Sequence, residues 1–171
     1  MSATGGSVPR TWVGPTAKER LGLLRATRTV AVVGASPNPA RASFFVATYL
    51  LASTDYETWF VNPVAAAKGE TILRREVFPD LASLPVVPDL VDVFRKAEDT
   101  PEVAREAVAV GAKALWLQLG VWSDEAARIA EEGGLSVVMD RCLKIEHARF
   151  HGGLHLFGFD TGQISSRKPR P

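Results

Sequence analysis

The sequence predicts an α/β protein: a Rossmann-like, doubly wound parallel sheet of about five strands in a three-layer α/β/α arrangement. Two observations predict it. Short apolar segments rich in β-branched residues alternate with segments that carry helix start and stop signals. These strand segments are apolar at nearly every position, as in strands that helices cover on both faces. Because crossovers between parallel strands are right-handed, the C-terminal ends of the strands are expected at one edge of the sheet.

Length, composition and charge are those of one globular domain. The chain has 171 residues, 46% hydrophobic and 23% charged, and its net charge of +1 provides no basic field for nucleic acid. It has one cysteine and no apolar run that suits a leader or a membrane span, so we expect a cytoplasmic protein without nucleic-acid or membrane partners. We expect a flexible N-terminal segment over residues 1–15, the domain over residues 16–151 and a weakly ordered tail over residues 152–171.

The first elements have clear boundary signals. Thr16 and Glu19 form a capping box that starts a short helix, and residues 29–33 are a strand. Asn38 is expected to cap a second helix, with Pro39 at its first position. This helix is expected to end near Ser53 and to bury Phe44, Phe45, Ala47, Leu50 and Leu51.

The later elements follow in a regular order. Strands are expected over residues 57–61, 89–94, 114–119 and 135–139, with a helical turn over residues 65–68 and a short edge strand over residues 70–73. Helices are expected to start at Thr100, at Ser123 and at about Arg141. Gly111 and the pair Gly133 and Gly134 end the first two of them.

The loop after the first strand has the strongest binding signal. Gly34 allows a tight turn out of the strand, and the free N–H groups of the following helix form an anion site. Arg41 lies in the first helical turn, where it opposes the helix dipole unless an anionic ligand is present. Pro37 and Pro39 stiffen the loop. The open alternative is an ordinary strand-to-helix turn with a solvent-facing arginine.

Doubly wound sheets bind ligands at their C-terminal edge, where the strand order reverses. The strand ends expected there are Gly34 to Ser36, Asn62 and Pro63, Phe94 and Arg95, Gln118 to Gly120, and Asp140 to Cys142. The first loop has only the first glycine of a dinucleotide fingerprint, and Asn62 stands where an acid would bind the ribose. No Walker lysine follows the glycine. The sequence therefore disfavours NAD and nucleoside triphosphates.

Five motifs occur in order along the chain: VVGASPNPAR, VNP, DLVDVFR, QLG and MDRCLKIEH. In this combination, residues 21–149 resemble the small stand-alone CoA-binding proteins and the CoA-binding domain of the succinyl-CoA synthetase α-subunit and related acyl-CoA synthetases. The resemblance implies that coenzyme A, or an acyl-CoA, lies along the C-terminal edge with its phosphates over the Gly-Ala-Ser-Pro-Asn-Pro loop. The residues expected to contact it are Gly34, Ala35, Ser36, Pro37, Asn38, Arg41, Asn62, Pro63, Phe94, Arg95, Gln118 and Gly120.

We expect a binding module without catalysis. The synthetase subunit has a second domain with a phosphorylated histidine, and we expect no such domain here, so the resemblance does not imply its ligation chemistry. Asp89 and Asp92 are expected to mark the entry of a strand and an exposed or paired position, not an acid/base pair. Lys68 is either a further phosphate contact or a solvated lysine. An NAD(P)-dependent oxidoreductase and an accessory subunit of an acyl-CoA ligase remain alternatives.

Two other features have competing interpretations. His147, His151 and His155 recur at intervals of four, but glycines interrupt the helix that would present them, and no metal site is expected. Cys142 at the start of the last helix either packs as a small apolar side chain or forms a mixed disulfide with the CoA thiol.

Overall fold

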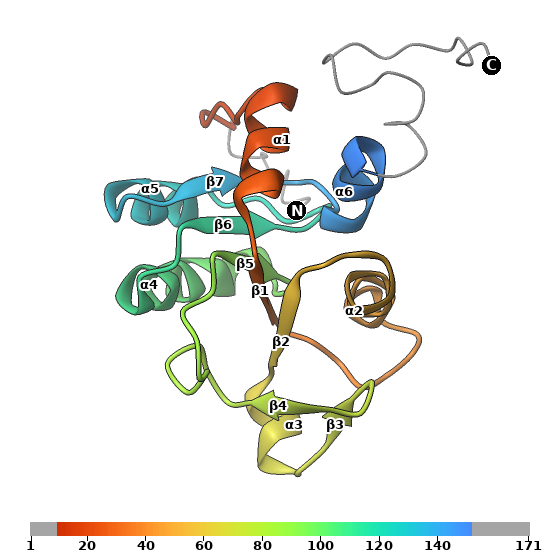
Figure 1. Ribbon diagram of the computed structural model, residues 1–171. Coiled ribbons are helices and arrows are strands. Elements are labelled where there is room, and N and C mark those ends of the chain that lie inside the picture. The colour runs from red at the N-terminus through yellow and green to blue at the C-terminus, as the bar shows by residue number, and fades with distance from the viewer. Residues whose placement is uncertain (1–9, 152–171) are drawn as a thin grey trace, which may run out of the picture.

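The computed structural model describes residues 10–151, which form a sheet flanked by helices on both faces (Figure 1). The sheet order is β3-β4-β2-β1-β5-β6-β7, and every pairing is parallel except that of β3 with β4. The predicted doubly wound α/β fold is therefore confirmed. The strands are β1 (Thr29–Val33), β2 (Glu57–Val61), β3 (Thr71–Ile72), β4 (Arg75–Phe78), β5 (Leu90–Val93), β6 (Ala114–Leu117) and β7 (Ser136–Val138).

The sheet has seven strands in the described residues, where the sequence predicted about five. The predicted edge strand is β3, and β4 was missed. Both residues of the connecting turn, Leu73 and Arg74, have positive φ angles of 49° and 65°. Such turns normally contain Asn or Gly, so this hairpin has no recognisable turn signal. The β4 sequence REVF also lacks the apolar character of a covered strand, because β4 lies near the edge of the sheet.

Helices form a layer on each face of the sheet. In Figure 1, α4 and α5 lie to the left of the central strands, and α2 and α6 lie to the right. The first layer packs on Val91 and Leu115, whereas α1, α2 and α6 pack on Val32 and Trp116. The helices are α1 (Ala17–Ala26), α2 (Ala42–Ser53), α3 (Pro63–Ala67), α4 (Thr100–Val110), α5 (Asp124–Glu132) and α6 (Leu143–His151), with a 3-10 turn at Ala97–Asp99. No helix in residues 10–151 is long and apolar enough to span a membrane.

Several predicted helix boundaries are confirmed. The Thr16 hydroxyl accepts the Glu19 N–H at 3.2 Å, and the Glu19 carboxylate accepts the Thr16 N–H at 2.6 Å, which completes the capping box. The Ser123 hydroxyl accepts the Ala126 N–H and caps α5. Gly111 ends α4 with a φ of 83°. Of the predicted N-terminal segment, residues 10–15 are described and contain no helix or strand; residues 1–9 and the predicted tail 152–171 lie outside the described residues.

The predicted start of α2 is wrong. The Asn38 side chain accepts the Ala40 N–H at 3.0 Å and closes a turn inside the loop, so α2 begins only at Ala42 and Arg41 is its N-cap. The predicted buried face of α2 is also wrong at one position, because Phe45 is 64% exposed, whereas Val46 is in the core.

The helix α4 begins at Thr100 as predicted, but Thr100 does not have the capping role that its side chain suggested. The Thr100 hydroxyl donates to the Ala97 carbonyl at 2.7 Å instead of accepting a helical N–H, and Asp99 occupies the N-cap position.

The strand order places a crevice between β1 and β5. The chain runs from β1 outward through β2 to β4 and β3, then returns to the other side of β1 with β5, β6 and β7. The connections that follow β1 and β5 therefore leave the sheet in opposite directions. The crevice between them is the usual ligand position in this class of fold.

A buried ion pair fixes α6 beside this crevice. Arg20 on α1 donates through Nε to Glu146 on α6 at 2.9 Å, and both side chains are almost fully enclosed. Arg141, just before α6, contacts the other oxygen of Glu146 at 3.3 Å. The paired carboxylate thus ties α6 to α1 and to the segment that precedes α6.

Candidate functional site

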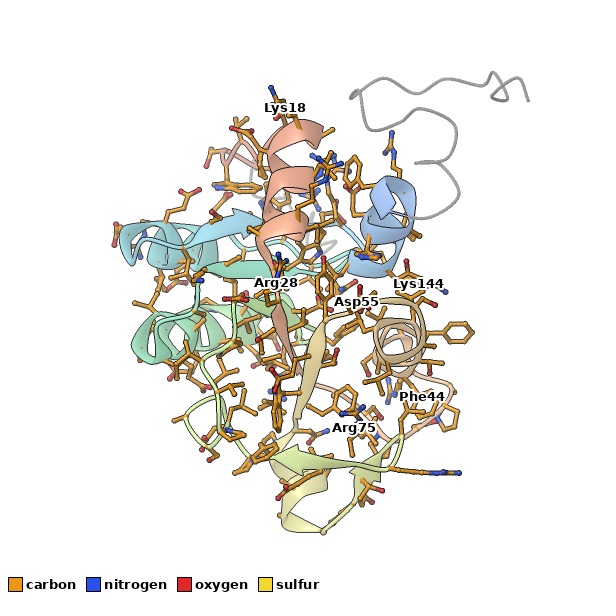
Figure 2. All side chains as sticks on the ribbon, in the orientation of Figure 1. Lys18, Arg28, Phe44, Asp55, Arg75 and Lys144 are labelled. Atoms are coloured by element: carbon orange, nitrogen blue, oxygen red, sulfur yellow. The ribbon has the colours of Figure 1, made fainter. Side chains whose placement is uncertain are left out.

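A pocket of about 720 Å³ opens at the C-terminal ends of β1, β5 and β6, between the first turns of α2 and α6. Figure 2 shows Phe44 on α2 and Lys144 on α6, the two helices that flank this side of the molecule. The residues that line the pocket are Gly34, Ser36, Arg41, Ala42, Ser43, Val46, Phe94, Arg95, Lys96, Gln118, Leu119, Val121, Cys142 and Ile145.

Gly34 makes the tight turn out of β1. Its φ is 80°, its N–H donates to the Val61 carbonyl at 2.9 Å, and a Cβ at this position would lie 2.3 Å from the Phe94 carbonyl oxygen. Only glycine satisfies both the backbone angle and this close approach. The turn therefore holds the loop after β1 directly against the end of β5.

The loop from Ser36 to Ser43 is fixed to the start of α2. The Ser36 N–H donates to the Ser43 hydroxyl at 3.1 Å, and the Asn38 N–H donates to the Ser36 hydroxyl at 3.1 Å. Among the described residues, no hydrogen bond uses the N–H groups of Ala42 and Ser43. These two free donors lie at the positive end of the α2 dipole, in residues that line the pocket, where an anion would be favoured.

Three cationic side chains line the same pocket: Arg41, Arg95 and Lys96. Arg95 pairs with Asp99 at 3.2 Å, but both side chains are about 40% exposed. Such an exposed pair contributes only about 0–1 kcal/mol, so Arg95 can exchange Asp99 for a ligand phosphate at little cost. The three cationic side chains therefore suit the binding of a polyanion.

Other lining residues of the pocket are apolar. They include Val46, Val121 and Ile145, and Leu119, which is 66% exposed. The half-buried Cys142 also lines the pocket. The lining therefore offers both cationic and apolar side chains to a ligand.

A buried carboxyl group lies next to the pocket. Asp92 on β5 is fully buried, and its Oδ1 accepts a hydrogen bond from Nε2 of Gln118, which lines the pocket. Burial raises the pKa of Asp92 to about 8, and the hydrogen bond from Gln118 opposes that rise. Asp89 marks the strand entry as predicted, bonded to the N–H groups of Arg28 and Thr29. The prediction of an exposed or paired Asp92 missed its complete burial.

The Asp92→Asn variant is expected to gain stability relative to the natural protein as the pH rises. The folded pKa of Asp92, about 8, exceeds the ordinary value of about 3.9, so the folded state holds an extra proton between these values and its stability falls as pH rises through that window. Asparagine keeps the acceptor without a titrating proton. Thermal unfolding of both proteins should show their stability difference growing by about 2 to 3 kcal/mol between pH 5 and pH 7. A difference that stays constant over this range would contradict the raised pKa.

The structure brings together six of the predicted contact residues in the pocket lining. They are Gly34, Ser36, Arg41, Phe94, Arg95 and Gln118. Pro63 lines an adjoining pocket of about 290 Å³ that shares Gly34 and Arg95 with the first.

The remaining predicted residues lie outside this lining. Ala35 is fully buried, and Pro37 and Asn38 lie in the loop between β1 and α2. The Asn62 side chain caps α3 by accepting the N–H groups of Val64 and Ala65 and donates to the Ala35 carbonyl at 2.7 Å. Asn62 therefore holds the loop after β1 through the Ala35 carbonyl and does not line the pocket. The Gly120 N–H donates to Asp140 at 2.7 Å.

Sequence reasoning missed a second group of lining residues: Ala42, Ser43, Val46, Lys96, Val121 and Ile145. Lys96 directly follows the predicted Arg95, and Leu119 lies within the predicted Gln118 to Gly120 segment. Ile145 carried no signal of its own, because its place in the pocket depends on how α6 packs.

Two other candidates lie apart from the pocket lining. Lys68 is the exposed C-cap of α3, and its contact with a phosphate remains a prediction. His147 contacts the Tyr49 hydroxyl through Nδ1 at 2.8 Å, while His155 lies outside the described residues. Within residues 10–151, no group of three metal-binding side chains comes together.

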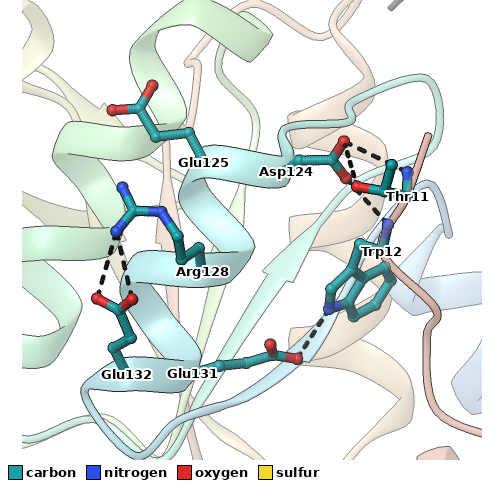
Figure 3. A pocket seen from close by; sticks show the side chains of 7 residues that line it. All are labelled: Thr11, Trp12, Asp124, Glu125, Arg128, Glu131 and Glu132. Carbon is teal, nitrogen blue, oxygen red and sulfur yellow. Dashed lines mark hydrogen bonds and ion pairs between the residues drawn. The ribbon is translucent and has the colours of Figure 1, made fainter. Parts of the chain in front are cut away.

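A second pocket, of about 380 Å³, lies at α5 and the N-terminal segment (Figure 3). Trp12 donates its backbone N–H to Asp124 and its indole N–H to Glu131. Its lining contains four carboxylates, those of Asp124, Glu125, Glu131 and Glu132, and one arginine, Arg128, which is itself paired with Glu132 (Figure 3). This excess of negative charge disfavours a phosphate-bearing ligand.

The chain matches the family model described as CoA binding domain over residues 28–148. It is 33% identical over 134 residues to the uncharacterised protein YneT of Bacillus subtilis, a match that covers 78% of this chain and 96% of YneT. Residues 28–148, which the family model matches, include the whole sheet and the residues that line the pocket between α2 and α6.

Solved structures share the fold. A hypothetical protein from Pyrococcus horikoshii OT3 has a TM-score of 0.74 and 35% identity, with 84% of this chain and 97% of that chain covered. A dinucleotide-forming acetyl-coenzyme A synthetase of Ca. Korarchaeum cryptofilum has a TM-score of 0.58 and 20% identity, with 68% of this chain and 27% of that chain covered. The second likeness shows the fold alone.

Proposed function

Because the chain belongs to the CoA binding domain family, we propose that it binds coenzyme A or an acyl-CoA in the pocket between α2 and α6. The observation that carries the proposal is the convergence of three features in one pocket. They are the glycine turn at Gly34, the free N–H groups of Ala42 and Ser43, and the cations Arg41, Arg95 and Lys96. Their position at the β1–β5 crevice is the one that this class of fold uses for ligands.

The chemistry of the pocket suggests how the ligand lies. The phosphates face the start of α2 and the three cations, where charge-assisted hydrogen bonds are strongest. The pantetheine arm packs against the apolar lining residues Val121 and Ile145. Loop residues Ala35, Pro37 and Asn38 complete the cradle, and Asn62, Pro63 and Gly120 support it. The thiol or acyl end then lies near Cys142.

We propose binding without catalysis by this chain. In the pocket lining, the side chains of nucleophilic type are Ser36, Ser43, Lys96 and Cys142, and no histidine or carboxylate lies in the lining to activate any of them. The assignment is to a binding module that holds a CoA ligand, not to an enzyme.

A ligand panel in a thermal unfolding assay tests this function. CoA and acetyl-CoA are expected to raise the melting temperature, because a ligand at 100 times its Kd adds about 2.7 kcal/mol to stability. NAD, NADP and ATP are expected to have little effect, since Asn62 is committed to capping α3 and no acid stands at the end of β2 to bind a ribose. Stabilisation by NAD or NADP but not by CoA would contradict the proposal and favour an oxidoreductase.

A further inference from the structure

Asp92 is a buried acid whose presence packing does not explain. It lies in the middle of the sheet, opposite Val32 of β1 and Trp116 of β6, and has no exposed surface. One carboxyl oxygen accepts from Gln118, and the other, Oδ2, is an enclosed atom without a hydrogen-bond partner. An unpaired buried polar group is destabilising. An aliphatic residue would suit this position better if packing were its only role.

The one side chain that Asp92 bonds is part of the pocket. Gln118 is only 5% exposed, yet it lines the space between α2 and α6. Its amide nitrogen is directed at Asp92, which fixes the orientation of the amide. In the described residues its Oε1 has no hydrogen-bond partner, and it is not among the enclosed unpaired atoms. The free oxygen therefore reaches the pocket as a hydrogen-bond acceptor.

We propose that Asp92 is a positioning residue for ligand binding: it holds the Gln118 amide so that Oε1 accepts a hydrogen bond from an N–H or O–H group of the bound ligand. This inference rests on the proposed function, since CoA offers amide N–H, hydroxyl and amino donors along its length. Without an acceptor at position 92, the amide is free to turn, and its NH₂ group then faces the ligand donor.

The test is a double-mutant cycle on CoA affinity, measured by titration calorimetry at pH 7. The variants are Asp92→Leu, Gln118→Leu and the double variant, with Asp92→Asn as the conservative control. Asp92→Leu is expected to raise the Kd by roughly 2- to 13-fold, the range for one lost hydrogen bond. Asp92→Asn keeps an acceptor oxygen and is expected to remain within about 2-fold of the natural protein. If Asp92→Leu does not fold, Asp92→Val replaces it in the cycle, because valine suits a buried strand.

The cycle separates positioning from a purely structural role. If Asp92 acts through Gln118, the Asp92→Leu change has no further effect in the Gln118→Leu background, and the two losses are not additive. Additive losses, or an Asp92→Leu protein that folds and binds CoA as tightly as the natural one, would overturn the inference and leave the proposed function intact. If the natural protein does not bind CoA, both fail together.

Discussion

Replacing Gly34 with alanine is expected to lower the free energy of unfolding by roughly 2 to 6 kcal/mol, the sum of backbone strain and overpacking. The φ of Gly34 is 80°, and the new Cβ would lie 2.3 Å from the Phe94 carbonyl oxygen. Because that atom belongs to the backbone at the end of β5, it cannot move aside without disturbing the sheet. Chemical denaturation of the variant measures the loss directly.

Gly134→Ala is the matched control for this prediction. Gly134 has a φ of 85°, but an added Cβ there meets nothing within 4 Å. Its alanine variant is therefore expected to show the backbone strain alone, roughly 1 to 3 kcal/mol. Equal losses in the two variants would contradict the idea that close contact between the β1 and β5 ends shapes the pocket.

Replacing Arg41 or Arg95 with alanine is expected to weaken CoA binding by roughly 10- to 150-fold each, since a hydrogen bond to a charged group contributes about 1.5–3 kcal/mol. Both side chains line the pocket and both are exposed, so the fold should keep its stability within about 0.5 kcal/mol. Titration calorimetry and thermal unfolding of the same samples measure the two quantities.

Arg128→Ala provides the control for Arg95. Each of these arginines pairs with an acid four residues along the chain, Glu132 for Arg128 and Asp99 for Arg95, but Arg128 lies in the pocket on α5. Its loss is expected to leave CoA affinity unchanged. If Arg41→Ala and Arg95→Ala also bind CoA normally, the phosphates do not lie where we propose.

The sequence predicted most of the sheet because its covered strands are continuously apolar. The strands TVAVV and ALWL are covered on both faces, and all their residues except the partly buried Thr29 are buried and apolar. The strand REVF is half exposed, so burial imposes no such pattern on it. Asn38 misled the prediction of α2, because an asparagine before proline suits a helix cap and a loop turn equally well, and only the bond to Ala40 decides.

The candidate site was predictable where it follows strand ends and not where it depends on packing. The topology brings the segments that follow β1 and β5 to the same pocket. These segments contain Gly34, Arg41 and Arg95. The roles of Asn62 and Asp92 depend instead on partners distant in the sequence: the Ala35 carbonyl for one and Gln118 for the other. No local pattern distinguishes such residues from ligand contacts or exposed acids.

Chemical-shift mapping by NMR tests the central claim most directly, because it reports both whether CoA binds and where. Adding CoA to the labelled protein is expected to shift the amide signals of residues 34–43 and 94–96, which surround the proposed phosphate site. The signals of Trp12, Asp124 and Arg128 at the acidic pocket are expected to stay in place. Shifts confined to that acidic pocket, or no shifts at saturating CoA, would contradict the proposed function.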